Sequence, residues 1–203
     1  MGLILTSVGE HSIMDVTGQD RVIHLLSKTC RNELFSDEEL SSGNLAPLDI
    51  IPFLDDSYIR GDELSHQIIK PGRVSQVHVG LLLAFMWESI TRTRLPPSDP
   101  TSETTFARAI DVRRFLNVPS TYSGLIQNMA YNDSTLQQIS DQLLGCIASQ
   151  LRQEIDPPKI EFRTRALATE LHRSRDKSHV SCTATVSPST SVSFSSWAKV
   201  NLC

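Results

Sequence analysis

A near-continuous apolar run at the start of the chain constrains its fold more than any other feature. Residues 2–8 read Gly-Leu-Ile-Leu-Thr-Ser-Val and are closed by Gly9, a pattern typical of a strand buried in a sheet. Such a strand needs neighbours, and no upstream residues supply them. The pattern then becomes helical over residues 17–35, so the chain is predicted to begin with a buried strand that leads into a helix.

The expected helix has an apolar stripe with a spacing of four residues, formed by Val22, Leu26, Cys30 and Leu34. The segment from Thr17 to Asp20 resembles a capping box in which Asp replaces the usual Glu. The sequence therefore predicts an amphipathic helix that is capped at Thr17 and buries one face.

Later segments alternate between helical and strand patterns. Helices are expected over residues 76–94, from Leu136 to Ile155 with Asp133 and Ser134 as caps, and over 160–173; strands are expected over 104–112, 180–186 and 191–202. Residues 36–75 contain scattered Gly, Pro and acidic residues, which predicts an extended connection along the surface. Because helices and strands intermingle, the expected class is α/β with a mixed β-sheet and flanking helices.

Composition and charge are those of an ordinary globular protein. The chain has 203 residues, of which 39% are hydrophobic and 21% charged, and its net charge is −4. This balance gives no electrostatic reason to expect nucleic acid or an anionic membrane as a partner. The longest apolar run, residues 77–90, contains His78 and Glu88 and is too short to cross a bilayer. We therefore expect a cytoplasmic protein.

The four cysteines are widely scattered, without the spacing of a metal site: Cys30, Cys146, Cys182 and Cys203. Two of them, Cys30 and Cys146, fall on apolar stripes of expected helices, which favours buried, inert thiols over disulfides. The sequence predicts no metal centre.

His11 and Asp15 form a candidate catalytic pattern, H-x-x-x-D, between the expected strand and helix. A neutral imidazole there can accept the proton of a hydroxyl, and the positive end of the helix opposes its protonation. The alternative is a hydrogen-bonded histidine at a strand end. The pattern alone is a weak signal, so its context decides between the two.

Three later segments supply that context: Thr-Thr-Phe-Ala-Arg-Ala-Ile-Asp-Val-Arg-Arg at 104–114, Pro-Ser-Thr-Tyr-Ser-Gly-Leu-Ile-Gln-Asn at 119–128, and Phe-Ser-Ser-Trp-Ala-Lys-Val-Asn-Leu at 194–202. With the histidine motif, and in this order, they resemble the fungal branch of the BAHD acyltransferases, the proteins related to trichothecene 3-O-acetyltransferase. The resemblance covers nearly the whole chain. It implies an incomplete, chloramphenicol-acetyltransferase-like, two-domain architecture. Residues 1–35 would be part of the N-terminal domain, 36–75 a crossover linker, and 76–203 the C-terminal domain without its last part.

The resemblance also implies roles for individual residues. His11 would be the general base that activates an acceptor alcohol toward acyl-CoA, most simply acetyl-CoA, with no covalent intermediate and no bound cofactor. In the family the Asp turns away from the cleft and pairs with an arginine, so Asp15 would hold the catalytic loop, with Arg113 as the candidate partner. Ser196, Trp197 and Asn128 would bind substrate. Ser196 and Trp197 would lie on a strand along the acceptor side of the channel, and Asn128 in a segment near it. Packing in the core is the alternative for Trp197. The arginines at 163, 165, 173 and 175 could bind coenzyme A phosphates or form a solvated helix face.

Two departures from the family pattern leave alternatives open. The second family signature, Asp-Phe-Gly-x-Gly, is not reached before Cys203, and only nine residues precede Glu10 and His11. We therefore expect a chain that is cut at both ends and that self-associates, although the family is monomeric. One alternative is a catalytically silent relative that is a gene remnant or a binding partner. Another is a condensation domain using carrier-bound thioesters, but that family usually has Gly directly after the Asp, where this chain has Val16.

Overall fold

The computed structural model describes residues 14–46, 50–68 and 83–195, so the expected strand over residues 2–8 lies outside the described part. The chain divides into two compact units. The first consists of residues 1–51, 111–127 and 197–203, and the second of residues 52–110 and 128–196. Residues 111–127 group with the start of the chain, and the expected domain boundaries at residues 35 and 75 stay a prediction.

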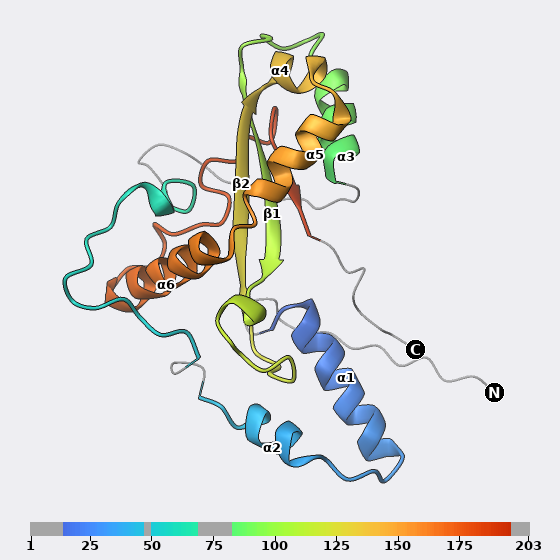
Figure 1. Ribbon diagram of the computed structural model, residues 1–203, viewed down its shortest axis with the longest axis vertical. Coiled ribbons are helices and arrows are strands. Elements are labelled where there is room, and N and C mark those ends of the chain that lie inside the picture. The colour runs from blue at the N-terminus through green and yellow to red at the C-terminus, as the bar shows by residue number, and fades with distance from the viewer. Residues whose placement is uncertain (1–13, 47–49, 69–82, 196–203) are drawn as a thin grey trace. The chain divides into compact units, whose positions relative to one another are not determined.

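A three-stranded sheet with the order β2-β1-β3 organises the second unit (Figure 1). The strands are β1 (Glu103–Asp111), β2 (Gln127–Thr135) and β3 (Val192–Phe194). β1 pairs in parallel with β3, which places Phe106 opposite Val192. β1 and β2 run in opposite directions (Figure 1), so the sheet is mixed and the expected α/β class is confirmed.

Helices on one face of the sheet enclose the larger apolar cluster. α3 (Leu83–Arg94), α4 (Leu136–Asp141) and α5 (Leu144–Gln153) provide Trp87, Ile139, Ile147 and Leu151, which pack with Phe106 and Phe194. The buried indole Nε1 of Trp87 donates to Thr104 Oγ1 at 3.0 Å, so the one polar atom of this large side chain is satisfied. A smaller cluster contains Ala107, Met129, Tyr131 and Val186.

The expected long helix from Leu136 to Ile155 is wrong in two respects. Asp133 and Ser134 belong to β2, and the N-cap is Thr135, whose hydroxyl accepts from the Gln138 amide at 3.2 Å. The helical pattern is then broken between α4 and α5, and Leu143 at the break is 77% exposed. β2 was missed because its polar end resembles a helix cap, whereas strand propensity depends mainly on pairing and burial within the sheet.

The expected strand over residues 180–186 is also wrong. Only Val180 makes a bridge, an antiparallel one to Ile68. The following residues form turns instead, in which the Thr183 amide donates to Ser181 Oγ at 3.2 Å and the Val186 amide to Thr183 O at 3.1 Å. Ser and Thr side chains that bond to nearby backbone groups compete with a strand in this way.

Residues 36–75 are not the unpacked connection that the sequence predicts, as far as they are described. They contain α2 (Asp37–Gly43) and the short helix η2 (Asp62–Leu64), whose Leu64 is 1% exposed. η2 packs against α6 (Pro157–Arg173), which begins before the expected residue 160 because Asp156 caps it and proline is tolerated in a first turn.

Arginines of α6 bind the backbone of this same segment. Arg165 donates to the carbonyls of Pro52 and Phe53 at 3.0 and 3.3 Å, and Arg173 donates to those of Tyr58 and Asp55 at 2.9 and 2.8 Å. These two guanidinium groups therefore hold the segment 52–58 against α6. The sequence suggested instead that the arginines of this run bind coenzyme A phosphates or form a solvated helix face.

In the first unit, α1 (Val16–Cys30) begins at Val16 because Asp15, and not Thr17, caps it. Its expected stripe is not buried, since Val22 is 39% and Leu26 is 47% exposed. Cys30 and Cys146 are exposed as well, so the expectation of buried thiols at these positions is wrong.

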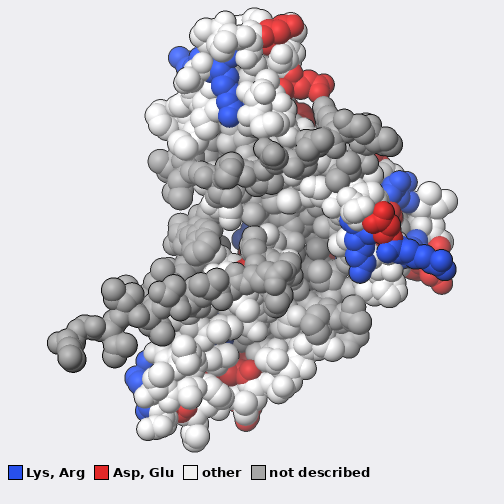
Figure 2. Space-filling model, turned by 180° about the vertical axis from the view of Figure 1, so that it is seen from behind, with Lys and Arg blue, Asp and Glu red and all other residues white. Residues whose placement is uncertain are grey.

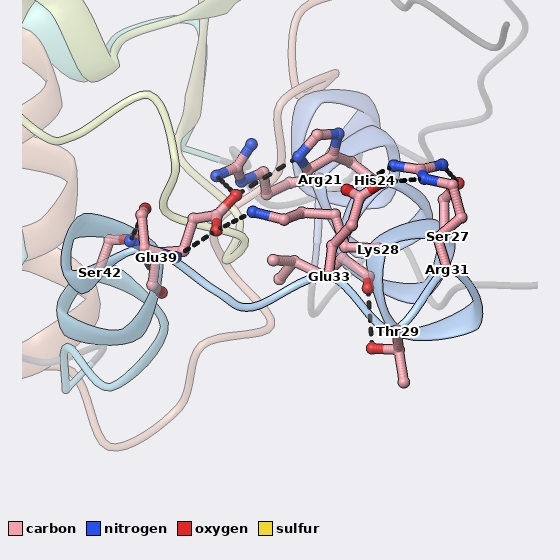
Figure 3. A network of polar contacts seen from close by, with 11 residues as sticks. Arg21, His24, Ser27, Lys28, Thr29, Arg31, Glu33, Glu39 and Ser42 are labelled. Atoms are coloured by element: carbon pink, nitrogen blue, oxygen red, sulfur yellow. Dashed lines mark hydrogen bonds and ion pairs between the residues drawn. The ribbon is translucent and has the colours of Figure 1, made fainter.

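Charge links α1 to α2. The carboxylate of Glu39 lies 2.9 Å from Arg21, 2.7 Å from Lys28 and 3.3 Å from His24, three side chains that extend from α1 toward it (Figure 3).

Charged side chains of both signs gather in mixed clusters on the face shown in Figure 2. Among the described residues, no helix has the length and hydrophobicity needed to span a membrane. The same residues contain no group of three His, Cys, Asp or Glu side chains that could hold a metal ion.

Candidate active site

Half of the predicted site residues can be located. His11, Ser196 and Trp197 lie outside the described residues, whereas Asp15, Arg113 and Asn128 lie inside them. The structure brings Asp15 and Arg113 together in the first unit, and it places Asn128 separately in β2 of the second unit.

Asp15 is the N-cap of α1. Its backbone is extended, with φ −83° and ψ 179°, and its Oδ1 accepts a hydrogen bond from the Gly18 amide at 2.8 Å. This bond satisfies one of the amides that a helix start leaves without a partner. The residue is 4% exposed, so the last residue of the H-x-x-x-D pattern is held at a buried position.

Arg113 forms a two-pronged ion pair with Asp15. Nη1 lies 2.9 Å from Oδ2 and Nη2 lies 3.0 Å from Oδ1, and the side chains are 4% and 6% exposed. The arginine is carried by the short helix η3 (Arg113–Phe115), two residues after β1 ends. Parallel hydrogen bonds of this kind fix orientation as well as distance.

Every polar hydrogen of the Arg113 guanidinium group has an acceptor. Besides its two bonds to Asp15, Nε donates to Tyr122 O at 3.3 Å, Nη2 to Gly124 O at 2.7 Å, and Nη1 to Asp111 Oδ1 at 3.0 Å. Five donors thus meet five acceptors, the full capacity of an arginine. One side chain therefore joins the end of β1, the start of α1 and the loop that precedes β2.

Asp15 is saturated in the same way. Its fourth hydrogen bond comes from the Ile126 amide, which donates to Oδ2 at 2.9 Å. With Gly18 and both nitrogens of Arg113, this occupies the roughly four acceptor positions of a carboxylate. No acceptor position is left for orienting a catalytic histidine, so the geometry favours an anchoring role over an Asp-His dyad.

We call the ion pair of Asp15 and Arg113, with the groups that hydrogen-bond to it, the anchor. Sequence reasoning missed several of its contributors. Asp111 accepts from both the backbone and the side chain of Arg113, and its spacing of two residues was an available signal. Ile126 contributes its backbone amide, which every residue except proline has, so the sequence gives no signal for this contact. Tyr122 is buried here, and burial raises the pKa of its phenol while the neighbouring Arg113 opposes that shift.

Asn128 is buried and bonded within the protein. Its Nδ2 donates to Thr164 Oγ1 at 3.0 Å, while Oδ1 accepts from Gln67 Nε2 at 2.8 Å and from the Met129 amide at 2.7 Å. These contacts join β2, α6 and the segment after η2. The expectation that Asn128 binds an acceptor stays a prediction.

Comparison with known proteins gives consistent matches. A family model described as the trichothecene 3-O-acetyltransferase-like N-terminal domain matches residues 1–30. The chain is 40% identical to O-acetyltransferase dmxR13 of Cryptosporiopsis sp., with coverage of 98% of this chain and 53% of the relative. It is 41% identical to trichothecene 3-O-acetyltransferase TRI101 of Fusarium sporotrichioides, with coverage of 98% and 51%.

Solved structures agree. TRI101 of F. graminearum complexed with ethyl coenzyme A has a TM-score of 0.88 at 42% identity, and the same protein with coenzyme A and deoxynivalenol has a TM-score of 0.89 at 40% identity. Each match covers 96% of this chain. The chain spans about half the length of these relatives. The aligned span of 242 residues also exceeds the 203 residues of this chain, so the relative contains residues within the span that this chain lacks.

Proposed function

Because the chain is homologous to trichothecene 3-O-acetyltransferase-like proteins, we propose that it takes part in acyl-CoA-dependent O-acylation. The acyl group would be acetyl, and the acceptor a hydroxyl of a fungal secondary metabolite or mycotoxin. Supporting this proposal, two relatives are named as O-acetyltransferases, and TRI101 of F. graminearum has been crystallised with coenzyme A and deoxynivalenol.

The observation that carries the proposal is the saturated ion pair between Asp15 and Arg113. Since the carboxylate has no free acceptor position, His11 is left as the acid–base group of the motif. It lies four positions before Asp15, and a chain of that length spans at most about 14 Å. Fixing Asp15 therefore restricts where the histidine can act.

The proposed chemistry is direct transfer. The neutral imidazole of His11 accepts the proton of the acceptor hydroxyl while that oxygen attacks the thioester carbonyl carbon of acetyl-CoA. A C–O bond forms, the C–S bond then breaks, and the imidazolium donates the proton to the departing coenzyme A thiolate. The products are the acetate ester and free coenzyme A, with no acyl-enzyme and no metal. Positioned base catalysis of this kind contributes about 10²–10⁴-fold.

Other roles in the proposal rest on the family resemblance. Ser196, Trp197 and Asn128 would bind substrate, and the reaction would take place in the cytoplasm. Acyl-CoA and the alcohol would be the only partners required.

The test is transfer of radiolabelled acetyl from acetyl-CoA to a panel of alcohols that includes deoxynivalenol. We expect His11→Ala to lower turnover by about 10²–10⁴-fold, since it removes the base. His172→Ala is the matched control, because His172 is an exposed residue of α6, and it should retain activity. Equal labelling by the wild type and His11→Ala would remove the base assignment.

One observation favours a second candidate, a catalytically silent relative that binds a partner. The chain lacks residues that its relative contains within the aligned span. A folded wild-type chain that transfers no acetyl group to any alcohol would favour this candidate.

A further inference from the structure

Gly18 lies against the backbone of the loop that precedes β2. A Cβ atom at this position would lie 2.0 Å from the carbonyl oxygen of Ser123, 2.9 Å from its carbonyl carbon and 3.1 Å from Met14 Cβ. The first two atoms are backbone, which cannot rotate away as a side chain can. The absence of a side chain at residue 18 is therefore a condition for the loop to contact the first turn of α1.

The loop is held from its other side by Arg113. Three consecutive carbonyl groups alternate in direction: those of Tyr122 and Gly124 accept from the guanidinium group, and that of Ser123 faces Gly18. The same loop delivers the Ile126 amide to Asp15, at 2.9 Å. A displacement of Ser123 would thus disturb the loop's hydrogen bonds to both Arg113 and Asp15.

Gly18 also contributes directly, because its amide donates to Asp15 Oδ1 at 2.8 Å. The residue is buried. Its amide donates a hydrogen bond to the anchor, and its lack of a side chain leaves room for the carbonyl group of Ser123. A Cβ at Gly43 or Gly145 would have no atom within 4 Å, whereas the atoms nearest a Cβ at Gly61 or Gly124 would be side-chain atoms of Glu63 or Tyr122 and not the backbone of another segment.

We propose that Gly18 is a positioning residue for the acyl transfer. It allows the loop 122–126 to close on the first turn of α1, which keeps Asp15 saturated and fixes the segment that carries His11. This inference rests on the proposed function for its catalytic part, whereas the closure of the loop stands on the contacts alone.

The test compares Gly18→Ala with Gly43→Ala. Gly43 is in the same unit and has open space around it, so its variant controls for the general effect of replacing a glycine by alanine in a helix. We expect Gly18→Ala to speed hydrogen exchange of the Ile126 amide by about tenfold or more, since the bond to Asp15 opens locally. We expect kcat to fall by about 10²-fold with the KM for acetyl-CoA unchanged, because a misplacement of about 1 Å has that effect. Gly43→Ala should change neither.

Each outcome bears on the inference. Unchanged exchange at Ile126 in a folded Gly18→Ala variant would overturn it, and so would a raised KM with unchanged kcat. Faster exchange in a protein whose wild type transfers no acetyl group would support the loop closure and refute the proposed function.

If Gly18→Ala folds too poorly to assay, native-state exchange of the wild type replaces it. The Gly18 and Ile126 amides both donate to Asp15, so they should open with the same free energy across denaturant concentrations. Separate opening would overturn the inference.

Discussion

At the scale of single residues, the buried pair of Asp15 and Arg113 connects the end of β1, the start of α1 and the loop before β2. Burying either charge alone is strongly unfavourable, and the arrangement is stable only because each hydrogen-bonding position is occupied. The same saturation makes Arg113 hard to replace. A lysine has three rotatable donors in place of a planar fork with five and cannot reproduce the contacts to Tyr122, Gly124 and Asp111.

We predict that Asp15→Ala lowers the free energy of unfolding by about 3–5 kcal/mol, because it leaves a buried guanidinium group without its counter-charge. The measurement is urea denaturation followed by circular dichroism. Asp56→Ala is the control, since that side chain is fully exposed and its removal should change stability by less than about 0.5 kcal/mol. A variant of Asp15 that folds normally and loses only turnover would show that the anchoring role is wrong.

At the scale of elements, Glu39 joins two helices by doing two things at once. Its side chain accepts from the Ser36 amide at 2.8 Å, which completes a capping box for α2, and the same carboxylate binds Arg21 and Lys28 of α1 (Figure 3). The hydrogen bond from Lys28 and that from the Ser36 amide lower the pKa of this carboxyl to about 2.

Glu39→Gln separates these two contributions, because glutamine still completes a capping box but carries no charge. A carboxyl with a depressed pKa stabilises the fold above its unfolded value of 4.5, and this contribution is lost as the pH falls toward 2. We therefore predict that the wild type is more stable than Glu39→Gln at pH 7, and that the difference shrinks between pH 4.5 and 2. Urea denaturation at several pH values measures it, and a difference that is constant with pH would contradict the assignment.

At the scale of the whole molecule, the two apolar clusters around Phe106 and Ala107 belong to the second unit, whereas α1 in the first unit leaves an apolar stripe exposed. Val22 and Leu26 lie one turn apart on this stripe and are 39% and 47% exposed. Neighbouring exposed apolar side chains promote association.

We predict that the isolated chain self-associates and that Leu26→Lys reduces this association. Light scattering over a range of concentrations measures it. Leu143→Lys is the matched control, because Leu143 is 77% exposed but belongs to the second unit and not to the stripe of α1. A wild-type monomer that melts in one sharp transition above about 65 °C would contradict the prediction.

Part of the fold and of the site could be predicted from sequence because the signals are local. The partial alternation of residues 104–112 predicts β1, and the helix expected over residues 160–173 covers most of α6. The pairing of Asp15 with Arg113 was also expected, although it came from the resemblance to a family and not from spacing. Its role in holding the catalytic histidine stays a prediction.

The remaining features depend on residues that are distant in the chain. The pattern of residues 127–135 does not reveal β2, because pairing with β1 decides its conformation, and the stripe on α1 does not reveal that Val22 and Leu26 stay exposed. The sequence by itself determined the spacing of apolar residues, and so which faces of the expected helices and strands are apolar. Only the tertiary structure decided which of those faces is covered, and that Asn128 and Gly18 are enclosed by their neighbours, because burial depends on what packs against a surface and not on its own composition.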